Sequence, residues 1–65
     1  MKEKFSKLAL GTKFQYGYAD KKVFVKIGSD LIAEWDESKK TDVWIGQGIY
    51  SFSEDNNLER EVVVL

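Results

Sequence analysis

The chain has 65 residues, carries a formal net charge of −1, and contains neither cysteine nor histidine. A chain of this length forms a single domain, here residues 1–65, and buries only about 60% of the surface that the unfolded chain exposes. The absence of the two residue types excludes disulfides, thiol nucleophiles, histidine bases and the usual zinc sites.

The remaining catalytic groups are carboxylates, lysines and tyrosines, and they form no recognisable constellation. No pair of acids has a spacing that forces both onto one site, and the oxygen-rich loops 36–38 and 53–57 lack the residue order of a calcium loop. The segment Gly46-Gln47-Gly48 lacks the third glycine and the lysine of a phosphate loop. We therefore expect a protein that is not an enzyme and that uses no cofactor or metal.

The first predicted element is a short helical turn within residues 1–12. Phe5, Leu8 and Ala9 have the i, i+3, i+4 spacing of a helical face, and Gly11 suits a helix C-terminal stop. We expect about one turn of helix here, which caps an open end of the sheet that follows.

Residues 13–27 predict a β-hairpin, because two runs with a period of two flank the turn dipeptide Asp20-Lys21. A two-residue loop places the apolar residues of both runs on one face of the hairpin. A three-residue loop would place the tyrosines on one face and the valines on the other. We therefore predict the two-residue loop. The predicted cross-strand pairs are Tyr18 with Val23, Tyr16 with Val25, and Phe14 with Ile27.

The other face of this hairpin is predicted to be basic and to carry one large aromatic residue. In the predicted register Phe24 lies opposite Gly17, and a ring that covers a cross-strand glycine is a known structural device. The residues of this face are Lys13, Gln15, Gly17, Ala19, Lys22, Phe24 and Lys26.

The second half of the chain predicts further strands. After the turn residues 28–30, apolar residues at alternate positions predict a strand over 31–35, and a solvated loop follows over 36–42. Residues 43–52 are either one bent strand or two short ones. Polar turn residues then precede residues 58–65, whose apolar end predicts the strand that closes the sheet.

Glycines within the 43–52 stretch indicate how the sheet bends. Gly46 and Gly48 mark a bulge or a tight bend of the kind that small barrels need to close. Five short strands and one helical turn predict an all-β fold, either a small five-stranded antiparallel barrel, SH3-like or OB-like, or a strongly twisted sheet. An uncovered edge strand would invite pairing with a second copy, so a homodimer through a sheet edge is also expected.

Charge is distributed unevenly along the chain. Residues 1–27 hold seven lysines and two acids, whereas residues 28–65 hold three basic and nine acidic residues. Such an asymmetry marks a polyanion-binding side, or else opposite charges that simply alternate around a small surface. No apolar run approaches the length of a membrane span, so we expect a cytoplasmic protein without a membrane partner.

Lysines interleaved with aromatic residues are typical of proteins that bind single-stranded nucleic acid. The basic hairpin face supplies the residues for this interpretation, although its only ring is Phe24. The predicted nucleic-acid-binding residues are Lys13, Gln15, Lys22, Phe24 and Lys26. The interpretation that places every aromatic residue in the core stands beside it.

A protein-binding surface is the alternative interpretation. Phe24, Ile32 and Trp44 alternate in a way that places them on the outer faces of their strands. Together they would form an apolar patch of the kind that marks a protein partner.

The pattern Phe5-x-x-Leu8-x-x-Gly11-x-x-Phe14, with the segments 23–27 (VFVKI) and 62–65 (VVVL), resembles a loose group of short uncharacterised phage and prophage proteins. The resemblance implies a small β protein of a mobile element or its bacterial host. Phage proteins of this size are often accessory factors that bind, and in some cases inhibit, a host protein. Our leading expectation is therefore a non-catalytic module that binds a host protein, with single-stranded nucleic acid as the alternative ligand.

A second likeness concerns the hairpin alone. Residues 14–18 (FQYGY) followed by residues 23–27 look like the paired nucleic-acid-binding strands of cold-shock domains. The resemblance implies that Phe14, Tyr16 and Phe24 correspond to the stacking rings of that family. The chain departs from the family in its acidic second half and in Lys26, where a histidine is usual.

Overall fold

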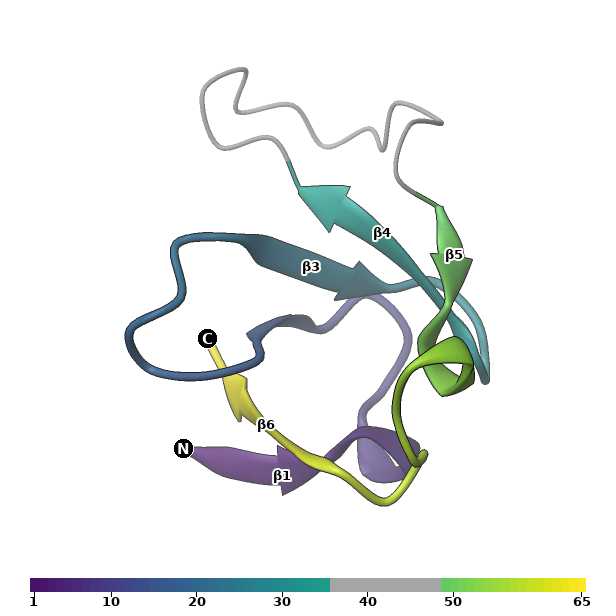
Figure 1. Ribbon diagram of the computed structural model, residues 1–65, viewed down its shortest axis with the longest axis horizontal. Helices are drawn as coiled ribbons and strands as arrows, with labels where there is room; N and C mark the ends of the chain where they lie inside the picture. The colour runs from purple at the N-terminus through teal and green to yellow at the C-terminus, as the bar shows by residue number, and fades with distance from the viewer. Residues whose placement is uncertain (36–48) are drawn as a thin grey trace.

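The computed structural model describes residues 1–35 and 49–65, which form one antiparallel sheet of six strands (Figure 1). The strand order is β1-β6-β2-β3-β4-β5, so β2 to β5 are sequential neighbours and β6 lies between β1 and β2. The strands are β1 (Lys2–Lys4), β2 (Lys13–Gln15), β3 (Val23–Lys26), β4 (Leu31–Trp35), β5 (Tyr50–Ser51) and β6 (Glu61–Val64). Single-turn 3-10 helices, η1 (Phe5–Lys7) and η2 (Phe52–Glu54), follow β1 and β5.

The sheet is strongly curled but open. In Figure 1, β3 and β4 lie above β1 and β6. Within the described residues, β1 and β5 are the two edges and no backbone pairing joins them. The expected all-β antiparallel fold is therefore confirmed as a twisted sheet, and η1 is the short helical turn expected near the N-terminus.

The described sheet has one strand more than the five expected. β1 has the sequence Lys-Glu-Lys, which carries no apolar alternation, and its position is set by antiparallel backbone pairing with β6. Of the stretch 43–52, only the end is described, where Tyr50 and Ser51 pair with β4. The predicted loop 36–42 and the predicted bend at Gly46 and Gly48 lie outside the described residues.

An aromatic cluster fills the concave face of the sheet. Phe5 of η1 stacks on Phe52 of η2 with ring centroids 3.9 Å apart, and Phe14 of β2 meets the Phe5 ring edge-on at 5.7 Å. Burying each such side chain contributes about 1.5–3 kcal/mol. The cluster consists of Phe5, Leu8, Phe14, Phe24, Ile32, Phe52 and Val62.

The predicted hairpin register is wrong. Phe14 pairs with Phe24, not with Ile27, because the chain turns earlier than expected, at Gly17–Asp20. There the Asp20 N–H donates to the Gly17 carbonyl at 3.1 Å, and the Gln15 side chain donates to the Asp20 carbonyl at 2.6 Å. A shift by an odd number of residues exchanges the two faces of one strand relative to the other. Phe24 consequently joins Phe14 on the concave face instead of covering Gly17.

The opposite, outer face of the sheet carries Val23 and Val25, which are also buried. Lys13 of β2 and Trp35 of β4 flank β3 on this face, since Lys13 pairs with Val25 and Trp35 pairs with Val23. Strands two positions apart are separated by about 9–10 Å. The Lys13 ammonium nevertheless lies 3.9 Å from the centroid of the Trp35 ring, so the two side chains meet over β3. The valines are buried beneath this bridge.

Lys26 does not belong to a solvent-facing basic surface, contrary to the prediction. It lies on the concave face at the end of β3 and is only 5% exposed. Its ammonium donates to the carbonyl of Phe5 at 2.9 Å and lies 4.6 Å from the centroid of the Phe5 ring. Lys26 thus fastens η1 to the sheet.

Asp30 performs a similar fastening role between the β3–β4 turn and η2. One carboxylate oxygen accepts from the Ser51 hydroxyl and the other from the Ser53 N–H, each at 2.7 Å. The hydrogen bonds from Ser53 and Ser51 hold the pKa of Asp30 below its ordinary value. This arrangement satisfies orphan N–H groups at the start of η2, as an N-cap residue does.

Candidate ligand site at the β2–β3 loop

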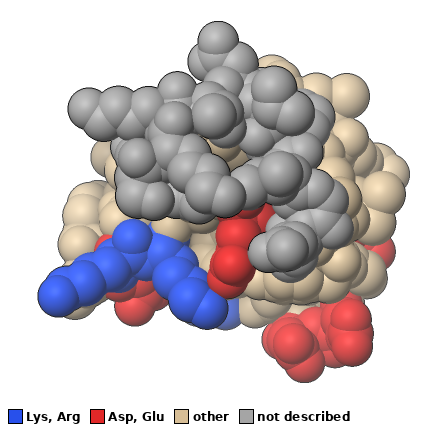
Figure 2. Space-filling model, turned by 90° about the horizontal axis from the view of Figure 1, so that it is seen from above, with Lys and Arg blue, Asp and Glu red and all other residues tan. Residues whose placement is uncertain are grey.

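The loop over residues 16–22, between β2 and β3, brings exposed basic and aromatic side chains together. It lies at the left of Figure 1, beside both chain termini. Seen from above, Lys and Arg side chains project together from that same side of the molecule (Figure 2). The loop therefore offers polar and charged groups next to two faces of the sheet, the concave face and the outer face.

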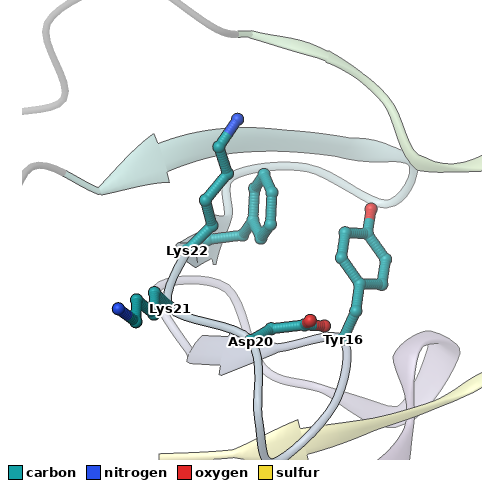
Figure 3. A pocket seen from close by; sticks show the side chains of 5 residues that line it. Tyr16, Asp20, Lys21 and Lys22 are labelled. Carbon is teal, nitrogen blue, oxygen red and sulfur yellow. The ribbon is translucent and has the colours of Figure 1, made fainter.

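A pocket of about 290 Å³ opens on the concave side of the loop. Its described lining consists of Tyr16, Asp20, Lys21, Lys22 and Phe24. Figure 3 shows the side chains of Tyr16 and Lys22 extending in the same direction, with the hydroxyl and the ammonium at their far ends. Lys21 turns outward, while the Asp20 carboxylate points along the floor toward Tyr16.

The walls of the pocket are aromatic rings at the edge of the core. Tyr16 and Phe24 meet edge to face with centroids 5.0 Å apart, and Tyr50 lies edge-on to Phe24 at 6.2 Å. Burial raises the pKa of the Tyr16 phenol, against the opposing effects of Asn56 and Arg60. Burial is likewise the main cause of the raised pKa of Tyr50.

Polar groups hold the Tyr16 ring in place from the far side. The Arg60 guanidinium lies 4.8 Å from the centroid of this ring and hydrogen-bonds to the Asn56 side chain. The Asn56 amide in turn donates to the Tyr16 hydroxyl at 3.5 Å and to the Phe52 carbonyl at 3.1 Å. The Phe52 ring also lies nearly parallel to the Tyr16 ring, with centroids 5.9 Å apart, so Tyr16 is held by several neighbours where it lines the pocket.

The rim of the pocket carries an ion pair. The Lys22 ammonium lies 3.0 Å from a carboxylate oxygen of Glu34, and both side chains are substantially exposed. An exposed pair of this kind contributes about 0.2–1 kcal/mol, so Lys22 can exchange Glu34 for another anion at little cost.

The outer face next to the loop carries two lysine–aromatic pairs. Lys13 lies over Trp35, as described above, and the Lys2 ammonium of β1 lies 5.7 Å from the centroid of the Tyr18 ring. Tyr18 is 68% exposed, and Trp35 is half-buried. Exposed cation–π contacts contribute only about 0.5–1 kcal/mol, so both rings remain accessible to a competing ligand.

The structure divides the predicted nucleic-acid-binding residues between two faces. Lys13 and Gln15 lie together on the outer face, as expected, but Lys22 and Phe24 belong to the concave face. Lys26 is buried beneath η1. The five residues therefore do not form one surface.

The predicted apolar patch on the outer face is wrong in its composition. Phe24 is 4% exposed and Ile32 is fully buried, and both belong to the core on the concave face. Trp44 lies outside the described residues. The corrected hairpin register explains the error for Phe24, because the shift in register exchanges the two faces of β3 relative to β2.

Sequence reasoning missed Asp20, Tyr18 and Trp35 as site residues. Asp20 was assigned only a turn role, and Tyr18 was assigned to the apolar face although it projects from the loop. The parity of Trp35 with Val23 and Val25 would have placed it on the outer face once the register was known.

Comparison with family models, with curated proteins and with solved structures gives no match for this chain. In the part of the chain that the structure describes, no helix is both long and apolar enough to cross a membrane. Among the same residues, no group of three or more acidic side chains could hold a metal ion. The class of the molecule is thus defined by its own geometry, a small open β-sheet with an aromatic and basic loop site.

Proposed function

We propose that this protein is a non-catalytic binding module whose ligand is single-stranded nucleic acid. The observation that carries the proposal is the pair of lysine–aromatic contacts on the outer face, Lys2 over Tyr18 and Lys13 over Trp35. Proteins of this kind stack bases on exposed rings and follow the phosphates with basic side chains. Both groups that such binding needs are present beside the β2–β3 loop.

The magnitudes favour displacement of each lysine by a base. Stacking a base on an aromatic ring contributes about 1–3 kcal/mol, which exceeds the about 0.5–1 kcal/mol of an exposed cation–π contact. A base that takes the face of Trp35 therefore releases the Lys13 ammonium, which can then contact the adjoining phosphate. Lys4 shares the outer face but lies opposite Glu61, so we assign it no role.

The test is fluorescence anisotropy of a labelled single-stranded oligonucleotide, titrated at several salt concentrations. For a single strand, each phosphate contact contributes about −0.7 to the slope of log K against log salt. The double variant Lys2→Gln/Lys13→Gln should therefore bind more weakly and lose about 1.4 from the magnitude of that slope.

Lys7 provides the matched control, because it is an exposed lysine on η1 and lies in no lysine–aromatic pair among the described residues. Lys7→Gln changes the net charge in the same direction, so it reports the effect of charge alone. Weakening by Lys7→Gln equal to that by Lys2→Gln alone or by Lys13→Gln alone would contradict the proposal, as would titrations that stay flat at low salt.

A protein partner is the second candidate, favoured by exposed apolar side chains beside β5, which is an edge strand among the described residues. Leu31 of β4 and Ile49, the residue preceding β5, are each 46% exposed. A purified host protein that binds this edge should lose affinity for the Leu31→Asp variant and keep it for Lys2→Gln/Lys13→Gln. The reverse pattern would assign the interaction to the outer-face lysines.

A further inference from the structure

We propose, as a deepening of the nucleic-acid-binding function, that the pocket below the β2–β3 loop receives one guanine base. The inference rests on the proposed function for its biological ligand, but it depends on different residues. The outer face carries no part of the pocket lining, so each idea can fail alone.

The size of the pocket limits its occupant to a single ring system. Its volume of about 290 Å³ lies just below the range of about 300–1,000 Å³ for small-molecule pockets. Two of its walls are the rings of Tyr16 and Phe24, which lie edge to face. Phe24 is only 4% exposed, so a planar aromatic group would stack chiefly on the more exposed Tyr16.

Asp20, an exposed residue, gives the pocket a hydrogen-bond acceptor. Its backbone is held on both sides, because its N–H donates to Gly17 and its carbonyl accepts from the Gln15 side chain. The carboxylate lies over Gly17, with Oδ2 3.4 Å from where a Cβ of that residue would stand. Among the described residues no group donates to this carboxylate, which points along the pocket floor (Figure 3).

A carboxylate with two accepting oxygens selects a ligand edge with two adjacent donors. Guanine presents N1–H and the N2 amino group side by side on its pairing edge. Adenine and cytosine present one amino group next to an accepting ring nitrogen, and uracil and thymine present one N–H between two carbonyls. Both of these patterns set an oxygen of Asp20 against another acceptor, so guanine fits best.

The lysines of the loop suit the phosphate attached to such a base. Lys21 turns away from the pocket into solvent, and Lys22 stands at the rim in an exposed pair with Glu34 (Figure 3). Both positions lie outside the ring-lined interior, where a phosphate would remain when the base is inside. The pocket thus combines an aromatic interior, one acceptor and a cationic rim.

The test is a ¹H–¹⁵N NMR titration of the protein with GMP, AMP, CMP and UMP. GMP should bind most tightly and shift the amide signals of residues 16–24. A bidentate contact to a base discriminates by about 1–3 kcal/mol, so the preference for GMP should be about five- to 150-fold. Asp20→Asn should reduce the affinity for GMP to that for the other nucleotides.

Two further variants separate the contributions. Lys21→Gln should weaken all four nucleotides by the same factor, because it removes a phosphate contact and no base contact. Lys2→Gln/Lys13→Gln should leave mononucleotide binding unchanged. Equal affinity for the four nucleotides, or a preference for GMP that survives Asp20→Asn, would overturn the guanine assignment. Loss of GMP binding in Lys2→Gln/Lys13→Gln would likewise overturn it by placing the base on the outer face.

The proposed function and the pocket assignment give different patterns of failure. Nucleotide binding that depends on Asp20, without salt-sensitive oligonucleotide binding, supports the pocket and contradicts the broader function. Oligonucleotide binding that depends on Lys13, with no effect of Asp20→Asn on a guanine-rich strand, supports the function and overturns the pocket assignment.

Discussion

Gly11 offers the clearest test of how the N-terminal segment is attached to the sheet. It has a φ of +91°, the only positive value among the described glycines. It occupies the third position of a turn closed by the hydrogen bond from the Thr12 N–H to the Ala9 carbonyl at 3.2 Å. A positive φ at this position is typical of a type II turn, which favours glycine. The Gly11 N–H also donates to the carbonyl of Lys26 at 2.7 Å.

Gly11→Ala should destabilise the protein through backbone conformation alone. No heavy atom lies within 4 Å of the position that a Cβ would take, so the new methyl group meets no steric obstacle. A left-handed conformation costs an alanine about 1–2 kcal/mol, while the loss of freedom in the unfolded chain returns about 0.4–1 kcal/mol. The net loss is about 1 kcal/mol, which lowers Tm by about 4–8 °C in a domain of this size.

Gly17→Ala is the matched control, because Gly17 has no positive φ and its Cβ would make only ordinary contacts with Asp20. Thermal unfolding followed by circular dichroism should show Gly17→Ala unchanged or slightly more stable. Replacement of Gly11 by D-alanine in synthetic protein should also preserve or raise Tm. Equal Tm values for Gly11→Ala and Gly17→Ala would refute the argument from backbone conformation.

Three other predictions concern single contacts. Ser53→Ala should raise the pKa of Asp30 toward its ordinary value, as measured by carboxyl NMR titration. A lowered folded-state pKa stabilises the protein above about pH 3.9, and this gain is lost as the pH falls through the folded-state pKa. In urea unfolding, the variant and the parent should therefore differ in stability at neutral pH and converge in acid. Asn56→Ala should raise the pKa of Tyr16 further, as followed by ¹³C NMR of the ring, and a downward change would contradict this. Burial already favours the neutral phenol over the phenolate. The resulting contribution to stability is present below about pH 10 and is lost as the pH rises through the folded-state pKa. Lys26→Ala should lower the free energy of unfolding, measured in urea, by about 2–4 kcal/mol, because it leaves a cavity. Lys26→Met should stay within about 1.5 kcal/mol of the parent, because it fills the space and the Phe5 carbonyl still accepts from the Leu8 N–H at 3.0 Å. Equal losses for the two variants would show that the ammonium itself is required.

Alternation along the chain predicted most strands but could not determine how they face one another. β3 reads Val-Phe-Val-Lys and all four residues are buried, so its sequence contains no polar face that would identify the solvent side. The register then depended on the position of the turn, which lies at Gly17–Asp20 and not at Asp20-Lys21. One misplaced turn reversed the assignments of Phe24 and Lys26 together.

Residue patterns also do not predict which strands distant in sequence pair with one another. β1 is polar and three residues long, and only its antiparallel pairing with β6 makes it a strand. Lys13 and Gln15 were placed on the correct face, since the alternation within β2 is independent of the turn. The role of Asp20 in the pocket depends on how the loop folds back, which residue spacing alone does not encode.

The pairing of β1 with β6 has a consequence for how the molecule assembles. It joins Lys2 to Val63, nearly the full length of the chain apart, and β6 pairs on its other side with β2, whereas β3 pairs only with its immediate neighbours β2 and β4. Closing the loop that brings β6 to β2 costs more chain entropy than forming the meander, and β1 pairs with β6 alone, so β1 should dock last and detach first. Amide hydrogen exchange should accordingly be faster in β1 than in β3. Lys2 reaches Tyr18 from β1, so the Lys2–Tyr18 part of the proposed ligand surface would then form and dissolve as β1 attaches and frays.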